Sequence, residues 1–74
     1  MAKHNVPIHR YTITLTNGEQ RTADGFTIRE HEEWLLVDDT RATVYQVRRD
    51  KVDEIARSAD PVGQQDVEDA GQGA

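Results

Sequence analysis

The chain has 74 residues, of which 35% are hydrophobic, and its 14 acidic and 9 basic side chains give a net charge of -5. A chain of this length builds one thin core, which excludes a two-domain enzyme and a deep substrate cavity. The absence of cysteine excludes disulfide bonds and thiolate metal sites. The longest apolar runs are far shorter than the roughly 18 residues of a membrane span, so we expect a soluble, cytoplasmic protein.

The first predicted element is a half-buried strand at residues 10–16. Tyr11, Ile13 and Leu15 alternate there with polar residues, which is the period-two pattern of a strand with one apolar face. Asn17-Gly18 follows at once. This pair predicts a hairpin with a type I′ turn, because both central residues of that turn need positive φ.

Four further strand segments are predicted along the chain. In order they cover residues 19–23, 26–29, 34–37 and 42–48. The Asp24-Gly25 pair, a polar loop at residues 30–33 and a turn at residues 38–41 separate them. Short strands at this spacing predict an all-β antiparallel meander of four or five strands that curls into a small SH3-like barrel.

The end of the predicted domain has two alternatives. Residues 50–59 have the pattern of a short helix, with Asp50 as its N-cap and Val52 and Ile55 on one face. Alternatively, a single tight turn at residues 49–51 leads into a last strand at residues 52–56. We favour the strand, because an open meander of this size needs a strand to close it.

Both ends of the chain are predicted to be flexible. Residues 61–74 contain three Gly, three Gln and three acids but no aromatic side chain, too little apolar surface to offset the entropy of ordering. The predicted organisation is therefore a flexible N-terminus at residues 1–5, a small β-barrel domain at residues 6–59, and a disordered acidic tail at residues 60–74.

The spacing of these elements resembles the SH3-like and Sm-like small barrels. The likeness covers residues 8–57 and rests on the Asn17-Gly18 hairpin, the strand around Trp34 and the tight turn at residues 49–51. The chain is also similar to small β proteins of bacteria and their phages. RNA-binding Sm proteins carry an Asp/Asn-bearing loop and an Arg-Gly pair, where this chain has Glu-His-Glu-Glu and Arg49-Asp50. The resemblance therefore implies a fold and not RNA binding.

The sequence offers no catalytic constellation. Ser58 is the sole serine and lies in no Gly-x-Ser-x-Gly turn, and the glycines stand singly rather than in a phosphate-binding loop. His4, His9 and His31 do not have the spacing of a metal site. We therefore predict that the protein is not an enzyme and holds neither a cofactor nor a metal ion.

The strand at residues 34–37 is apolar on both faces. With period two, Trp34 and Leu36 point to one side, and Leu35 and Val37 point to the other. A small barrel has one interior, so the outward pair needs a second cover, supplied either by another part of the chain or by a partner. The sequence does not decide which pair points outward.

These observations predict a non-catalytic protein-interaction module, acting as a homodimer, an adaptor or a small inhibitor of a larger protein. The residues expected to form its aromatic-aliphatic patch and to orient the partner are Trp34, Tyr45, Val47, Arg48 and Arg49. The alternative is a nucleic-acid-binding barrel that uses Arg41, Arg48 and Arg49. Against it, residues 1–60 contain all 9 basic residues but also 11 of the 14 acids, so they carry no surplus of positive charge.

Overall fold

The computed structural model describes residues 3–68, which form seven strands and one turn of 3₁₀ helix. In chain order the elements are β1 (Lys3–Leu15), β2 (Gln20–Gly25), β3 (Thr27–His31), β4 (Trp34–Asp38), β5 (Thr43–Arg48), η1 (Arg49–Lys51), β6 (Val52–Arg57) and β7 (Gly63–Glu68). The predicted all-β fold is confirmed. This part of the chain has no helix with the length and apolar character that a membrane crossing requires.

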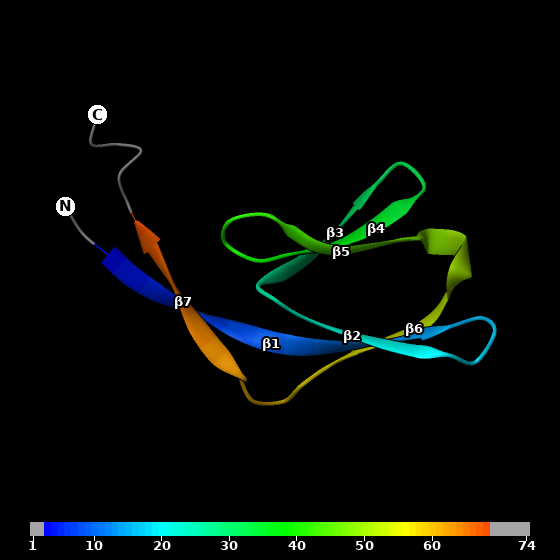
Figure 1. The fold of residues 1–74 in the computed structure, drawn as a ribbon, viewed down its shortest axis with the longest axis horizontal. Helices are drawn as coiled ribbons and strands as arrows, with labels where there is room; N and C mark the ends of the chain where they lie inside the picture. Colours follow the sequence, from blue (N-terminus) through cyan, green and yellow to red (C-terminus); the bar gives the residue numbers. More distant parts are fainter. Residues whose placement is uncertain (1–2, 69–74) are drawn as a thin grey trace.

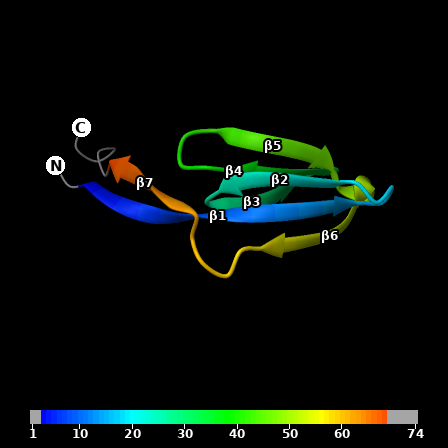
Figure 2. The same ribbon diagram turned by 60° about the horizontal axis from the view of Figure 1, so that its bottom comes forward.

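The strands form two antiparallel sheets. The first has the order β2-β1-β6, with β7 also paired to β1, and the second has the order β3-β4-β5. Figures 1 and 2 show the second sheet lying over the first, with the chain crossing between them after β2 and again at η1. Among residues 3–68 no ladder joins one sheet to the other, so the predicted closure into a barrel is not observed.

Strand β1 is the central strand of the first sheet and pairs with all three of its other strands. It pairs with β2 over residues 9–14, with β6 over residues 11–15 and with β7 over residues 3–8. Residues 3–8 and β7 form a two-stranded ribbon that projects from the two-sheet body (Figure 1). This ribbon makes the molecule elongated, with a radius of gyration of 14.1 Å against about 11 Å for a compact chain of this length.

The core lies between the two sheets and is small. Its centre consists of Tyr11 and Ile13 of β1 and Val37 of β4, of which Ile13 and Val37 are fully buried. Half-buried side chains packed around them are Leu15, Ala23, Ile28, Tyr45, Val52 and Ile55. The predicted inward face of β1 is confirmed, because its alternating apolar residues meet the second sheet.

The hairpin at Asn17-Gly18 is confirmed, but its predicted type I′ turn is wrong. Only Gly18 has a positive φ, of 91°. The Gly18 N–H donates to the Leu15 carbonyl at 2.9 Å, and the Leu15 N–H donates to the Glu19 carbonyl at 2.8 Å. This pattern belongs to a three-residue turn that ends in a glycine in the left-handed region. The Asn17 side chain also accepts a bond from the Glu19 N–H, which favours this turn.

Gly25 allows the chain to pass from the first sheet to the second. A Cβ atom at this position would lie 2.6 Å from Val37 Cγ1 and 2.9 Å from the Asp38 carbonyl oxygen. The next residue, Phe26, donates its N–H to the same Asp38 carbonyl at 2.7 Å. The close approach of β2 to the end of β4 therefore requires a residue without a side chain.

The predicted loop at residues 30–33 is shorter in the structure. Strand β3 continues to His31, which pairs with Trp34, and only Glu32 and Glu33 form the turn. Glu32 has a φ of 56°, a conformation uncommon for a residue with a side chain. No glycine marks this second hairpin, because a glutamate occupies the left-handed position.

Of the two alternatives for residues 50–59, the strand is confirmed. The 3₁₀ turn η1 is followed directly by β6, which pairs with β1. The Thr16 N–H donates to the Lys51 carbonyl at 2.9 Å and ties η1 to the end of β1. A helix here would have left this edge of β1 without a partner.

The predicted flexibility of residues 1–5 and 60–74 differs from the structure in part. Strand β1 begins at Lys3, and residues 63–68 form β7 in register with β1. The residues of β7 have low strand propensity. Its formation therefore depends on backbone pairing with β1 and on side-chain hydrogen bonds, such as the one that Asn5 Nδ2 donates to Gln64 Oε1. Residues 1–2 and 69–74 lie outside the described residues.

Replacing Gly18 by valine should destabilise the fold by on the order of 1–3 kcal/mol. The cause is backbone strain alone, because a Cβ atom at Gly18 would meet nothing within 4 Å. Gly18→Asn is the matched control, since asparagine tolerates the left-handed region. Urea unfolding of the two variants should separate them clearly. Equal stabilities would show that the turn does not depend on this conformation.

Candidate functional site

The structure determines which side of β4 faces the core. Leu35 and Val37 are 5% and 0% exposed and point toward the first sheet. Trp34 and Leu36 alternate with them and therefore lie on the opposite side of the second sheet. Trp34 is 37% exposed, whereas Leu36 is 9% exposed. The side of the second sheet that faces away from the core therefore carries its own apolar residues.

We call this side of the second sheet the outer face. Cross-strand pairing places its central side chains in two rows, His31–Trp34–Arg48 and Arg29–Leu36–Gln46. Leu36 thus has long polar side chains on both neighbouring strands. Because their aliphatic parts can lie over an apolar neighbour, Leu36 is shielded while Trp34, nearer the end of the sheet, remains accessible.

Trp34 and Arg48 lie next to each other on the outer face. The Arg48 guanidinium lies 6.0 Å from the centre of the Trp34 ring, at the outer limit of a cation–π interaction. The same guanidinium donates to Glu33 Oε1 and lies 3.6 Å from Asp50 Oδ1. These acids restrict the conformations of Arg48 and so fix the position of its charge beside the indole ring.

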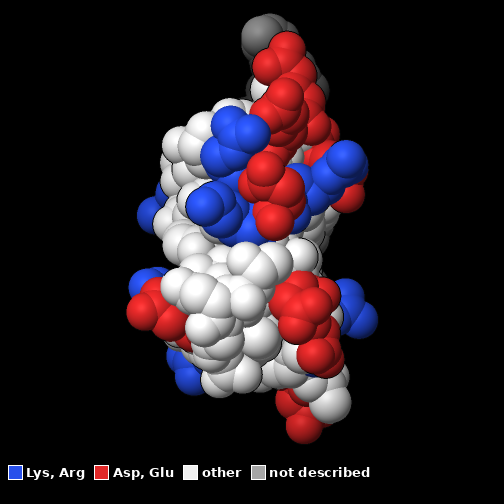
Figure 3. All heavy atoms as spheres, turned by 90° about the vertical axis from the view of Figure 1, so that its right-hand side faces the viewer, with Lys and Arg blue, Asp and Glu red and all other residues white. Residues whose placement is uncertain are grey.

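Arg49 ties the β3–β4 turn to η1. Its N–H donates to the Glu33 carbonyl at 2.8 Å, and its guanidinium donates to Glu30 Oε1 at 2.9 Å. A shallow hollow of about 310 Å³ lies between Glu33, Arg49 and Asp50. Figure 3 shows that at this end of the molecule Lys and Arg atoms are interleaved with Asp and Glu atoms. Arg48 and Arg49 here form ion pairs within the chain.

Tyr45 and Val47 do not belong to the same surface as Trp34. Tyr45 pairs with Val37, and Val47 pairs with Leu35, so both point toward the core, where they are half-buried. The predicted site therefore combined residues from two faces of one sheet. Of its five members, the structure brings only Trp34 and Arg48 into contact on the outer face. The missing information was the register of β5 on β4.

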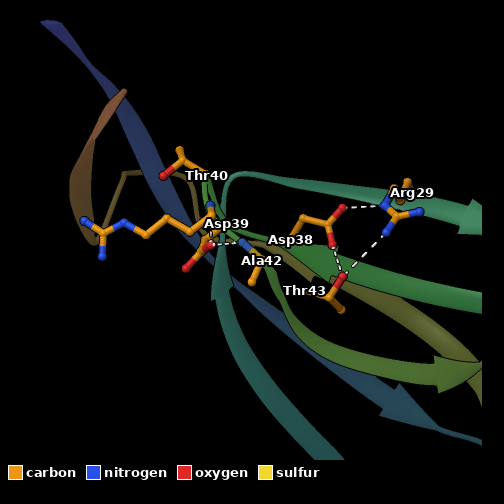
Figure 4. Close-up of a pocket in the computed structure, with 7 residues that line it drawn as sticks. Arg29, Asp38, Asp39, Thr40, Ala42 and Thr43 are labelled. Carbon is orange, nitrogen blue, oxygen red and sulfur yellow. Dashed lines mark hydrogen bonds and ion pairs between the residues drawn. The ribbon is translucent and has the colours of Figure 1, made fainter. Parts of the chain in front are cut away.

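A second polar site lies at the β4–β5 turn. An open hollow of about 250 Å³ is lined by Arg29 and by residues 38–43 (Figure 4). Arg29 donates to Asp38 Oδ2, and the Thr43 hydroxyl donates to Asp38 Oδ1 at 2.7 Å. The hydrogen bonds from Thr43 and Arg29 lower the pKa of Asp38. Arg29 is thus already bonded within the chain and is not free for a ligand's anion.

Asp39 organises the turn itself. Its Oδ1 accepts the N–H groups of Arg41 and Ala42 at 2.8 and 2.9 Å, and its Oδ2 accepts a bond from Gln65 Nε2 at 3.2 Å. These bonds lower the pKa of Asp39, the two backbone donors most. Arg41 lies exposed in this turn. It is one of the three arginines of the nucleic-acid alternative, and the length of β5 separates it from Arg48.

Gln65 of β7 is a structural residue that the sequence reasoning missed. Its Oε1 accepts bonds from the Thr40 N–H at 2.9 Å and the Thr40 hydroxyl at 2.6 Å. Together with the bond to Asp39, these contacts join the ribbon to the turn of the second sheet. A glutamine in an acidic, glycine-containing segment gives no signal for such a role.

Within the part of the chain that the structure describes, no group of three His, Asp or Glu side chains could hold a metal ion. Comparisons with protein-family models, with curated proteins and with solved structures find no match for this chain.

Acid should weaken the fold as the pH falls through about 4 and below. The pKa values of Asp24, Asp38 and Asp39 are lowered by hydrogen bonds in the folded state, so the unfolded chain, with a carboxyl pKa of about 3.9, binds more protons in this range. The stabilisation is fully present at pH values above the carboxyl pKa of the unfolded chain. It is lost as the pH falls through the lower pKa values that these three carboxyl groups have in the folded chain.

The measurement is the slope of unfolding free energy against pH between about 2 and 5. Asp38→Asn should reduce that slope, whereas Asp53→Asn, on exposed β6 and outside these networks, should leave it close to that of the wild type. An unchanged slope in Asp38→Asn would contradict the role given to its hydrogen bonds.

Proposed function

We propose that this protein is a non-catalytic protein-interaction module, a homodimer or an adaptor, that binds through the outer face of β3, β4 and β5. The observation that carries the proposal is the exposure of Trp34 beside Leu36 with the Arg48 guanidinium held over its ring. Tryptophan and arginine are the side chains most enriched at the energetic centres of protein interfaces.

The surroundings of Trp34 support this proposal. The inner side of the second sheet already packs in the core. Trp34 lies on the other side of that sheet and is therefore not needed to bury Val37 or Ile13. Three-stranded sheets with one face covered commonly leave a polar second face. Here the second face carries an indole ring and a leucine in its middle strand, which fits contact with another protein.

Nucleic-acid binding by Arg41, Arg48 and Arg49 has less support. Arg48 and Arg49 are both paired with acids of the β3–β4 turn, and a phosphate would have to compete with these carboxylates. Arg41 lies at the opposite end of β5 from the other two. The three arginines therefore do not form one phosphate-binding surface.

A small SH3-like barrel is the finer fold that goes with this proposal. It is supported by the order of the pairings, in which β2 and β3 are the two halves of one strand bent at Gly25, and η1 leads from β5 into a strand beside β1. In this interpretation the molecule is a partly open barrel, with the outer face on its convex side.

Replacing Trp34 by glutamate should weaken partner binding or self-association by roughly 30-fold or more, the effect of losing a central interface residue. The fold should survive, because Trp34 lies outside the core cluster. Val62→Glu is the matched control: Val62 is also exposed but lies in the connection between β6 and β7. Tyr45→Glu should instead unfold the chain.

Light scattering and pull-down assays on the wild type and these variants measure the effect. Association that persists at high salt and is lost only in Trp34→Glu supports the proposal. Binding to a labelled oligonucleotide that falls steeply with salt would favour the nucleic-acid alternative. Equal association by the wild type and Trp34→Glu would refute the assignment of the outer face.

A further inference from the structure

The tip of the β1–β2 hairpin carries an exposed Asn-Gly pair, Asn17-Gly18. Asparagine is a chemically labile residue. Its side-chain carbon Cγ can be attacked by the backbone nitrogen of the next residue, which closes a five-membered ring and expels the amide nitrogen. Glycine is the residue that obstructs this attack least, because it has no Cβ atom. The pair is therefore a candidate site of chemical modification, separate from the outer face.

The turn holds the two reacting groups close together. Asn17 Oδ1 accepts the Glu19 N–H at 2.9 Å, so the side chain folds back over the peptide group of Gly18. Asn17 Cγ and the Gly18 nitrogen both belong to the ring of atoms that this hydrogen bond closes. Holding two reacting atoms near each other raises the rate of their reaction.

The same hydrogen bond stabilises the charge that forms during the attack. Negative charge develops on Asn17 Oδ1, and the Glu19 N–H already donates to that atom. One bond opposes the reaction, since the Gly18 N–H donates to the Leu15 carbonyl at 2.9 Å and must be released first. This bond lies in an exposed turn, where local opening costs little free energy and leaves the two sheets intact.

Asn5, the other asparagine of the chain, lacks these features although it is also exposed. It lies in the extended strand β1 and precedes Val6, whose β-branched side chain obstructs attack by the backbone nitrogen. Its Nδ2 donates to Gln64 Oε1 at 3.2 Å, which holds the side chain toward β7. Asn5 is therefore a control within the same molecule.

The Asp24-Gly25 pair is protected from the equivalent reaction. An aspartate closes the ring only when its carboxyl group is neutral, because an ionised carboxylate is a poor electrophile. Asp24 accepts hydrogen bonds from Arg10 Nε at 2.8 Å and Nη2 at 3.2 Å, and this contact lowers its pKa. Gly25 is also buried against β4. The reaction is therefore expected at the hairpin tip and not at this pair.

We propose that Asn17 is a site of spontaneous deamidation in the folded protein. Hydroxide from the solvent removes the proton of the Gly18 N–H, and the nitrogen forms a new bond to Asn17 Cγ. The Cγ–Nδ2 bond breaks, and Nδ2 takes a proton from water and leaves as ammonia, which leaves a succinimide ring. Water then opens the ring at either of its two carbonyl carbons and gives aspartate or isoaspartate. The reaction consumes water and needs no other reactant.

The isoaspartate product should loosen the hairpin. Its main chain runs through Cβ and Cγ, so one extra carbon atom enters the backbone of the turn. The turn is closed by hydrogen bonds from Leu15 to Gly18 and Glu19, and these depend on the present backbone spacing. The aspartate product keeps that spacing, and its carboxylate can still accept the Glu19 N–H. A loss of stability is therefore expected from the isoaspartate product and not from the aspartate product.

The test incubates the full chain at mildly alkaline pH and follows both asparagines by peptide mass mapping. Asn17 should react at least about tenfold faster than Asn5. Gly18→Ala should slow the reaction at Asn17 roughly tenfold, because the added Cβ obstructs the attack. This variant should still fold, since a Cβ at Gly18 meets no residue beyond its chain neighbours within 4 Å.

A parallel incubation in guanidinium chloride gives the rate in the unfolded chain. If the reaction required global unfolding, the rate in buffer would be lower by the full unfolding equilibrium constant, which a denaturant titration measures. We expect a much smaller ratio. Equal rates at Asn17 and Asn5, or a rate in buffer reduced by that full constant, would overturn the proposal.

The purified isoaspartate form should unfold at a lower urea concentration than both the fresh wild type and Asn17→Asp. The Asn17→Asp variant is the matched control, because it carries the same added charge on an unchanged backbone. Equal unfolding midpoints for the isoaspartate form and Asn17→Asp would refute the loosening of the hairpin.

Discussion

The contact between Ile13 of β1 and the second sheet at Val37 of β4 holds the fold together, because these are the two side chains that the described structure buries completely. Each comes from the central strand of its sheet. A chain of 74 residues has few large apolar residues to place, and this contact uses the inward faces of both central strands. Gly25 permits it by letting β2 pass against Val37 without a side chain in between.

That constraint also determines what remains for function. Because Leu35 and Val37 are committed to the core, Trp34 and Leu36 must lie on the far side of the same strand. The charged residues at the ends of the second sheet are then used to hold its turns: Arg48 and Arg49 secure the β3–β4 turn. Trp34 is left accessible on the outer face, while Arg48 and Arg49 beside it are already paired with acids.

The sequence was sufficient for the parts of the fold that local patterns determine. Alternation placed Tyr11, Ile13 and Leu15 on one face, Asn17-Gly18 marked the hairpin, and the tight turn at residues 49–51 led into a strand. It could not give the register of β5 on β4, and so it grouped Tyr45 with Trp34 although they occupy opposite faces.

The errors elsewhere have similar physical causes. Strand β7 has weak strand propensity, and it forms through pairing with β1 and through the contacts of Gln65, both of which are tertiary. The turn at Glu32 adopts positive φ without glycine, so the polar residues 30–33 predicted a loop but not the tight turn at residues 32–33. Burial, exposure and the Trp34–Arg48 contact all depend on the relative position of strands, which a single sequence does not specify.

The two-faced arrangement of β4 is tested most directly through Trp34, the single tryptophan of the chain. Its fluorescence can be quenched with acrylamide at a dilution where light scattering shows a monomer. We expect emission and quenching typical of a partly exposed indole in the folded monomer, with protection of the ring appearing only on association. A folded monomer whose tryptophan is as inaccessible as a core residue would contradict the two-faced arrangement of β4.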